Sequence, residues 1–246
     1  MKQLVRCVGL LVLAVVALQV FFVLRIASMA VLDPQSTAFE RSSAFVLLRD
    51  QTNFSALPPW RQEWTPYDQI SDHLKRAVIA SEDASFTDHE GVDWEAIEKA
   101  WERNALIEAA LEKKASSAKA QRPRKMVGGS TITQQLAKNL FLSGERKLVR
   151  KSQELVLSYA LEGLLSKQRI LEIYLNNVEW GEGVFGAEAA AQHYFRKSAR
   201  ALSPYEAARL AVMLPRPKFF EKRPRSAYIN GRAATIVARM GSVEIP

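Results

Sequence analysis

The sequence predicts a mainly α-helical domain that follows a single apolar N-terminal helix. Beyond residue 64, apolar residues recur at helical spacing through most of the chain. Residues 65–68 and 203–206 each combine a capping hydroxyl, a proline at the first helical position and a carboxylate, which is typical of a helix start. The sequence contains neither a tandem repeat nor a series of alternating strands. The expected fold class is therefore mainly α, with one core.

The composition is that of a globular protein with a positive surplus. The chain has 246 residues, 48% of them hydrophobic, and 34 Lys and Arg against 26 Asp and Glu give a net charge of +8. This length allows one sizeable domain or two small ones. The single cysteine, Cys7, excludes an internal disulfide and a metal site with several thiolates. The surplus charge suggests a polyanionic partner, which is nucleic acid, anionic lipid or a phosphate-bearing substrate.

Residues 7–24 form an uncharged apolar run between Lys2 and Arg6 on one side and Arg25 on the other. As a helix this run is about 27 Å long, enough to cross a thin bilayer core. A cleaved signal peptide is the alternative, but secretory apolar regions are usually shorter, which favours an uncleaved single-pass anchor. The basic residues before the run favour a cytoplasmic N-terminus and an exported domain. We expect a cytoplasmic tip and transmembrane anchor over residues 1–30.

Two further boundaries follow from composition. Residues 31–64 show little periodicity and are expected to be a linker and membrane-proximal segment, with a short strand at residues 44–48. Residues 65–246 then form the helical domain. Within it, residues 112–125 are polar and basic and contain Pro123, which favours a loop.

Residues 82–91, EDASFTDHEG, place five ionisable side chains around Phe86 directly after an amphipathic helix. Acids are unusual at a helix C-terminus because the helix dipole disfavours negative charge there. An acidic turn without function is one interpretation. The other is a functional carboxylate, Glu82, placed to act as a general base.

Residues 128–139, GGSTITQQLAKN, lead from a glycine pair into a helix whose first turns are rich in hydroxyls and amides. A plain N-cap needs only one hydroxyl. The free N–H groups of a helix N-terminus also bind anions or sugar hydroxyls. The spacing of a Walker loop is absent, so nucleotide binding of that kind is not expected.

Five cations follow within fourteen residues, and they define a basic stretch. They are Lys138, Arg146, Lys147, Arg150 and Lys151. A solvated helix face with one surface ion pair is one interpretation, and a pyrophosphate clamp is the other. A nucleic-acid partner is less favoured because aromatic residues that stack on bases are scarce here.

Residues 181–186 fit G-x-G-x-x-G but follow a predicted helix instead of a strand, so dinucleotide binding is rejected.

Four segments together carry a resemblance to a known family. The segments EDASFTDHEG, GGSTITQQLAKN, RKSQE (150–154) and KQRILEIYLN (167–176) resemble, in order and spacing, the peptidoglycan glycosyltransferase family. That family includes the N-terminal domains of class A penicillin-binding proteins and stand-alone monofunctional transglycosylases. The similarity covers residues 65–215, and the 31 residues after Pro215 (246 − 215) fit the monofunctional type. A fifth family motif is only partly present, with Ala233 where a second arginine is usual.

The resemblance implies a lysozyme-like helical fold and a membrane-bound substrate. That substrate is lipid II, a disaccharide-pentapeptide on undecaprenyl pyrophosphate, which is polymerised into a glycan strand with inversion at the anomeric carbon and release of the lipid pyrophosphate. The implied location is the inner membrane, with the catalytic domain in the periplasm. Other cell-wall synthesis or division proteins are expected partners, and nucleic acid is not.

The resemblance also implies residue roles. Glu82 takes the proton from the acceptor 4-hydroxyl, and Glu154, the second catalytic acid, orients the cations or helps to hold the diphosphate. Asp83, Phe86 and His89 support Glu82. Substrate and pyrophosphate binding is assigned to Ser130, Thr131, Gln134, Gln135, Lys138, Arg146, Arg150 and Lys151. No cofactor is obligatory and no metal site is certain, while a divalent cation, Mg²⁺ or Mn²⁺, is compatible with the pyrophosphate.

Two other functions fit the same residues. A lysozyme-like or lytic enzyme would use Glu82 as a general acid to cleave glycan, and a membrane-anchored scaffold would bind lipid II without turnover. A hydrolase protonates a sugar leaving group and has no use for a phosphate clamp, so the cations favour synthesis.

Overall fold

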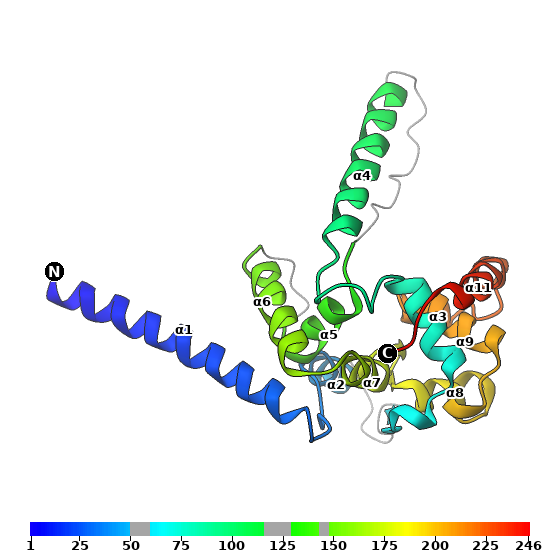
Figure 1. Cartoon of the computed structure of the whole chain (residues 1–246), viewed down its shortest axis with the longest axis horizontal. Coiled ribbons are helices and arrows are strands. Elements are labelled where there is room, and N and C mark those ends of the chain that lie inside the picture. The colour runs from blue at the N-terminus through cyan, green and yellow to red at the C-terminus, as the bar shows by residue number, and fades with distance from the viewer. Residues whose placement is uncertain (50–59, 116–128, 143–147) are drawn as a thin grey trace.

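The computed structural model describes residues 1–49, 60–115, 129–142 and 148–246, and it confirms a mainly α-helical fold. The helices are α1 (Lys2–Ser28), α2 (Ala38–Arg49), α3 (Asp72–Glu82), α4 (Trp94–Ala115), α5 (Ile132–Phe141), α6 (Leu148–Leu164), α7 (Lys167–Asn177), α8 (Ala187–Phe195), α9 (Pro204–Met213), α10 (Pro217–Glu221) and α11 (Ala227–Arg239) (Figure 1). Short 3₁₀ turns lie at η1 (Tyr67–Gln69), η2 (Ala199–Ala201) and η3 (Met240–Ser242).

Helix α7 lies in the middle of the helical body, as Figure 1 shows. Ser166 caps its N-terminus by accepting a hydrogen bond from the backbone N–H of Arg169. Ile170, Leu171 and Leu175 are completely buried, because α7 contacts α5 and α6 on one side and α8 on another. Most residues of α7 are buried, including Asn176 and Asn177, so α7 is a core helix around which the other elements pack.

Helices α3, α9 and α11 form a second packed group. Leu74, Ala77 and Val78 of α3 are buried against α9 and α11. The predicted start of α9 is confirmed, since Ser203 and Glu206 form a reciprocal capping box with Pro204 in the first turn. This group holds the C-terminal end of α3, where Glu82 lies, against the rest of the domain.

The sequence misplaced the start of α3. No helix begins at residue 65. Thr65 is instead buried, and its backbone N–H donates to Asn176 Oδ1 at 2.8 Å. The 3₁₀ turn η1 follows, and α3 begins at Asp72 with Ser71 as its cap. A long-range contact with α7 therefore overrides a local helix-start pattern.

The strand predicted at residues 44–48 is wrong, because these residues belong to α2. A capping box starts this helix. The backbone N–H of Glu40 donates to Thr37 Oγ1 at 3.0 Å, and Glu40 Oε2 accepts from the backbone N–H of Thr37 at 2.7 Å. Helix α2 packs against α5, so this part of the predicted linker belongs to the folded body. The domain boundaries themselves remain predictions.

A small sheet joins distant segments. Strand β1 (Arg61–Gln62) pairs in parallel with β3 (Val184–Phe185), and β3 pairs antiparallel with β2 (Glu179–Gly181). The G-x-G-x-x-G sequence is the β2–β3 hairpin and its exit. Gly186 has φ +84°, and a Cβ at this position would lie 2.7 Å from the carbonyl oxygen of Asn176. The glycine is therefore required for close packing.

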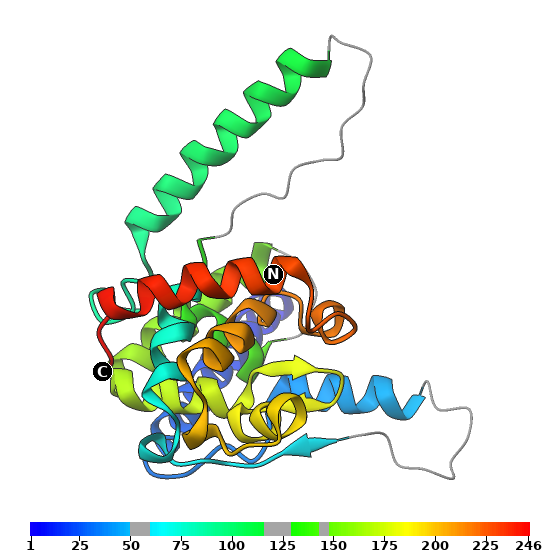
Figure 2. The same cartoon turned by 90° about the vertical axis from the view of Figure 1, so that its right-hand side faces the viewer.

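Two helices project from the body in different directions, as Figures 1 and 2 show. Within the described parts of the chain, α1 is the one helix long and apolar enough to span a membrane, with a mean hydropathy of 2.9 over its most apolar window. The other is α4, which includes residues 112–115 of the predicted loop; residues 116–125 of that loop lie outside the described residues.

Candidate active site

Glu82 is the last residue of α3, and a side chain from α5 fixes its carboxylate. Gln135 Nε2 donates to Glu82 Oε2 at 3.1 Å, and Ser81 Oγ lies 3.4 Å from Glu82 Oε1. The Tyr174 hydroxyl donates to Gln135 Oε1 at 2.9 Å, so the amide turns its NH₂ group toward Glu82. Burial and the charges of Glu82 and Asp83 raise the pKa of Tyr174 well above its usual value, which keeps it a donor.

Asp83 ties the loop after α3 to the N-terminus of α5. Its carboxylate accepts from the backbone N–H of Ile132 at 2.9 Å and from His89 Nε2 at 3.0 Å. His89 Nδ1 in turn accepts from the backbone N–H of Gly91 at 3.1 Å, so the ring proton is on Nε2. A carboxylate at a helix N-terminus is favoured by the helix dipole. Asp83 and His89 thus fix the turn that follows Glu82, and their role as supports of the Glu82 carboxylate stays a prediction.

The turn that carries Asp83 and His89 rests on a buried aromatic ring. Phe86 is completely buried. Lys167 Nζ lies 4.6 Å from the centre of that ring and donates to the His89 carbonyl at 2.5 Å. Phe86 therefore supports the acidic turn by packing, and Lys167 is a second structural support of this turn.

A cation cluster lies on α5 and α6. Arg150 Nη1 donates to Glu154 Oε2 at 3.0 Å, and Lys151 pairs with Glu154 Oε1. Glu154 is only 4% exposed, so its carboxylate needs these partners. Arg150 Nε is buried and has no hydrogen-bond partner among the described residues. A buried donor of this kind calls for an acceptor, which a bound anion would supply.

Lys138 connects this cluster with Glu82. Burial lowers the pKa of Lys138, the charge of Glu154 opposes that shift, Arg150 and Lys151 add to it, and Glu82 opposes it. These influences require Lys138 to lie close to both carboxylates and to both cations. Glu82 and the cation cluster therefore lie in one region of the molecule and not on opposite sides of it.

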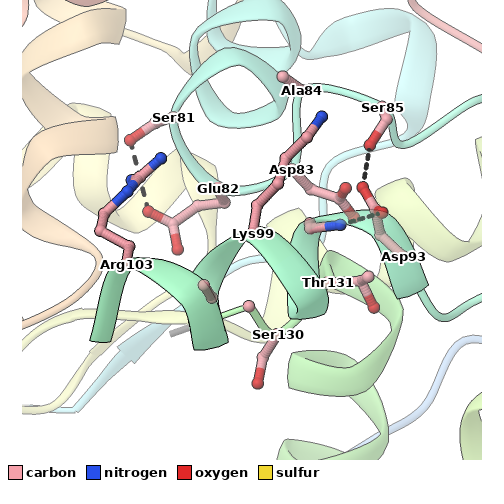
Figure 3. A pocket seen from close by; sticks show the side chains of 13 residues that line it. Ser81, Glu82, Asp83, Ala84, Ser85, Asp93, Lys99, Arg103, Ser130 and Thr131 are labelled. Atoms are coloured by element: carbon pink, nitrogen blue, oxygen red, sulfur yellow. Dashed lines mark hydrogen bonds between the residues drawn. The ribbon is translucent and has the colours of Figure 1, made fainter. Parts of the chain in front are cut away.

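A cavity of about 360 Å³ opens beside Glu82 (Figure 3). Its walls are the end of α3, one side of α4, and residues 129–131 before α5. Asp83, Asp93, Lys99 and Arg103 line it together with Glu82. A volume of this size accommodates part of a sugar-containing ligand.

Comparison with known proteins decides the family. Residues 50–241 match the Transglycosylase family. The chain belongs to that family. Three relatives, each named a biosynthetic peptidoglycan transglycosylase, support the assignment along nearly the whole chain. The protein of Herminiimonas arsenicoxydans is 49% identical over 96% of this chain and 94% of its own. Those of Burkholderia thailandensis and Cupriavidus metallidurans are each 51% identical, over 94% and 100% of this chain and 82% and 100% of their own.

Membership of the transglycosylase family confirms the resemblance found in the sequence and agrees with the helical, lysozyme-like fold. The structure then sorts the residues predicted to bind substrate. Ser130 is exposed and, like Thr131, lines the cavity. Thr131 and Gln134 are 2% exposed and form the capping box of α5. Thr131 Oγ1 also donates to the Gly91 carbonyl at 2.7 Å. Their hydroxyl and amide groups stabilise the helix start, and a binding role for them stays a prediction.

Three cationic residues need separate mention. Arg146 lies outside the described residues, so its assigned role stays a prediction. Lys99 and Arg103 of α4 line the cavity and are not among the predicted site residues. Their spacing of four on a helix that directly follows the acidic turn was the available signal, because it places both on one helix face.

The described residues contain no group of three His, Cys, Asp or Glu side chains that could hold a metal ion. The cation cluster offers one carboxylate, Glu154, and both of its oxygens already interact with Arg150 and Lys151. A metal ligand set supplied by the chain alone therefore does not fit this part of the structure.

Proposed function

We propose that this chain is a membrane-anchored peptidoglycan glycosyltransferase that polymerises lipid II into linear glycan strands and releases undecaprenyl pyrophosphate. The observation that carries the proposal is the position of Lys138, which is close both to the Glu82 carboxylate and to the Arg150, Lys151 and Glu154 cluster. A base for the attacking hydroxyl and cations for the departing diphosphate thus belong to one site.

The reaction is a single displacement. Glu82 accepts the proton of the acceptor 4-hydroxyl while that oxygen attacks the anomeric carbon of the donor, and the bond to the diphosphate breaks. The configuration changes from α to β because the attacking and leaving oxygens occupy opposite faces of the sugar. A positioned base contributes about 10²- to 10⁴-fold, so the leaving group needs separate stabilisation. Lys138, Arg150 and Lys151 supply it by compensating the charge that develops on the diphosphate.

The environment of Glu82 suits this base role. Gln135 holds one carboxylate oxygen, and Tyr174 fixes the amide of Gln135, so the carboxylate has a defined direction. We include no metal in the scheme. A Mg²⁺ or Mn²⁺ ion that assists would arrive with the diphosphate, because the oxygens of Glu154 are already paired.

The contacts of α1 support a lipid-linked substrate. Gln19 of α1 and Gln153 of α6 exchange two amide hydrogen bonds of 3.1 and 3.0 Å. Phe22 of α1 packs edge to face on Phe141 of α5, with ring centres 5.3 Å apart. Gln153 precedes Glu154 on α6, so the anchor contacts the helix that carries part of the cation cluster. We place α1 in the inner membrane and the catalytic domain on the periplasmic side, with lipid II, the growing strand and other cell-wall proteins as partners.

Glycan hydrolysis is the second candidate, and the cavity disfavours it. Retaining glycosidases use a second carboxylate as nucleophile, and inverting ones use it to activate water. The other acids of the cavity are engaged. Asp83 binds Ile132 and His89, and Asp93 accepts from the backbone N–H of Ala96 at 2.7 Å and from Ser85 Oγ at 2.5 Å. Transfer of a glycosyl group from a diphosphate requires one carboxylate base together with cations that stabilise the leaving group.

The test is the product formed from purified lipid II by the full chain in detergent micelles. Synthesis gives long glycan and free undecaprenyl pyrophosphate, hydrolysis shortens added glycan, and a scaffold gives no turnover. Glu82→Gln should abolish polymerisation while the Kd for lipid II stays within about threefold of the unmodified chain. Glu63→Gln, at an exposed acid, is the control. Undiminished polymerisation by Glu82→Gln would refute the base assignment.

A further inference from the structure

The α4 wall of the cavity carries two basic side chains. Lys99 and Arg103 lie one turn apart on α4, and both line the cavity that contains Glu82. Figure 3 shows the two side chains reaching over the cavity from α4, with Arg103 directed toward Ser81 and Glu82. The cations that we assign to the diphosphate come from α5 and α6. The two basic residues that line the cavity are therefore separate from that cluster.

The protein itself does not use these two charges fully. Arg103 is exposed and makes no hydrogen bond or ion pair with any described residue. Lys99 pairs only with Glu95, one turn earlier on the same exposed helix face. Such an i, i+4 surface pair is worth a few tenths of a kcal/mol and is easily exchanged for a stronger partner.

Two of the acids beside these cations accept hydrogen bonds from other groups, and the charge of Lys99 also favours ionised Asp93. Asp83 is bound to His89 and to the N-terminus of α5, and Asp93 caps the first turn of α4. Neither carboxylate pairs with Lys99 or Arg103 in the structure. The cavity thus presents cationic groups to an incoming ligand on the α4 side, where an anionic part of the ligand would bind.

The substrate in the proposed function has a second kind of anion at the right place. In lipid II, the sugar whose anomeric carbon carries the diphosphate also carries the pentapeptide. When that carbon lies at Glu82, the diphosphate and the peptide leave the same ring in different directions. The diphosphate faces α5 and α6, which directs the peptide to another wall of the cavity.

We infer that Lys99 and Arg103 bind a carboxylate of the donor pentapeptide and so select for a substrate whose peptide is negatively charged. This inference rests on the proposed function and adds a specificity subsite to it. Arginine binds a carboxylate with two parallel N–H donors, and Lys99 adds a point charge beside it. Both side chains are long and partly solvated, so the subsite contributes to substrate preference more than to the chemical step.

The expected effect is modest because the pairs are exposed. Two exposed ion pairs together change kcat/KM by about three- to tenfold, and added salt lowers the effect. Replacement of both residues by glutamine removes the charges and keeps good helix formers on α4. Thermal unfolding of Lys99→Gln/Arg103→Gln should therefore match that of the unmodified chain.

The experiment compares two substrates with the full-length chain in detergent micelles. One is lipid II with free peptide carboxylates, and the other is lipid II with every peptide carboxylate converted to a carboxamide. The unmodified chain should polymerise the free acid about three- to tenfold more efficiently. The double variant should use both substrates at the efficiency with which the unmodified chain uses the amidated one. Arg200→Gln/Lys222→Gln, which removes one exposed arginine and one exposed lysine elsewhere, should keep the preference.

Three results would overturn the inference. Equal use of the two substrates by the unmodified chain means that peptide charge is not recognised. A preference retained by the double variant means that other residues recognise it. An equal loss on both substrates means that the two cations act on the diphosphate or on Glu82, and a shifted pH profile would identify the latter. No polymerisation of either substrate by the unmodified chain would refute the proposed function itself, and the subsite with it.

Discussion

Glu179 is an ionisable group that the fold buries away from the cavity. It lies on β2 with its side chain 7% exposed, and Lys218 Nζ is 3.3 Å from its Oε1. That oxygen has no hydrogen-bond donor among the described residues. Burial raises the pKa of Glu179 to about 7, Lys218 opposes the shift, and the charges of Glu221 and Glu182 add to it. Glu221 is itself 3.4 Å from His193.

The sign of the effect follows from proton binding. An unfolded glutamate titrates near 4.5, and folded Glu179 titrates at about 7. Between these values the folded state binds more protons than the unfolded state, so this group lowers the free energy of unfolding as pH rises through the window. The difference of about 2.5 pKa units corresponds to about 3 kcal/mol. The destabilisation is complete above pH 7 and absent below pH 4.5.

Glu179→Gln should therefore stabilise the chain in a pH-dependent manner. Gln cannot ionise, and Lys218 is 46% exposed, so water solvates the lysine once its partner is neutral. The free energy of unfolding, measured by denaturant titration in detergent micelles, should exceed that of the unmodified chain by up to about 3 kcal/mol at pH 8 and should match it near pH 4.5. Glu63→Gln, at an exposed acid that does not act on Glu179, is the control. A difference between Glu179→Gln and the unmodified chain that stays constant across this range would refute the reasoning.

Three further changes test the active site. Asp83→Ala leaves the Ile132 N–H and His89 without their acceptor, so it should lower the free energy of unfolding by about 2–4 kcal/mol, against less than about 0.5 for exposed Asp68→Ala, by denaturant titration. Lys138→Met should reduce turnover about 10²- to 10³-fold without lowering thermal stability, because burial already disfavours the charged lysine; a matching loss of stability would contradict this. Tyr174→Phe frees the amide of Gln135 to rotate and should lower kcat about two- to tenfold, whereas exposed Tyr205→Phe should not change it.

Local patterns predicted the elements whose ends are fixed by their own residues. The capping box of Ser203 and Glu206 starts α9 where the sequence placed it. The box of Thr37 and Glu40 starts α2 in the same way, and the helix that it starts includes the residues 44–48 for which a strand was wrongly predicted. The hydroxyl of Thr65 looked like a third cap, yet Asn176, 111 residues away, holds that segment extended. Such a contact has no local signature.

The candidate site divides in the same way. The sequence motifs predicted Glu82, Lys138, Arg150 and Glu154 as site residues. The fold brings these four residues into one region. The sequence did not reveal which polar side chains of GGSTITQQLAKN serve the helix and which face the cavity. Thr131 and Gln134 serve the cap, while Gln135, one residue later, reaches Glu82. A shift of one residue turns a helix side chain by about 100°, so this division depends on helix phase, which capping sets.

Helix α5 fixes the position of the base Glu82 relative to Lys138, which stabilises the leaving group. Gln135 and Lys138 are three residues apart and so lie on one helix face, where the first contacts Glu82 and the second faces the cluster on α6. Asp83 binds the N-terminus of the same helix, so the residue after the base fixes the helix that carries its partner. Helix α6 continues the connection, because Glu154 pairs with the cations while Gln153 holds the anchor helix.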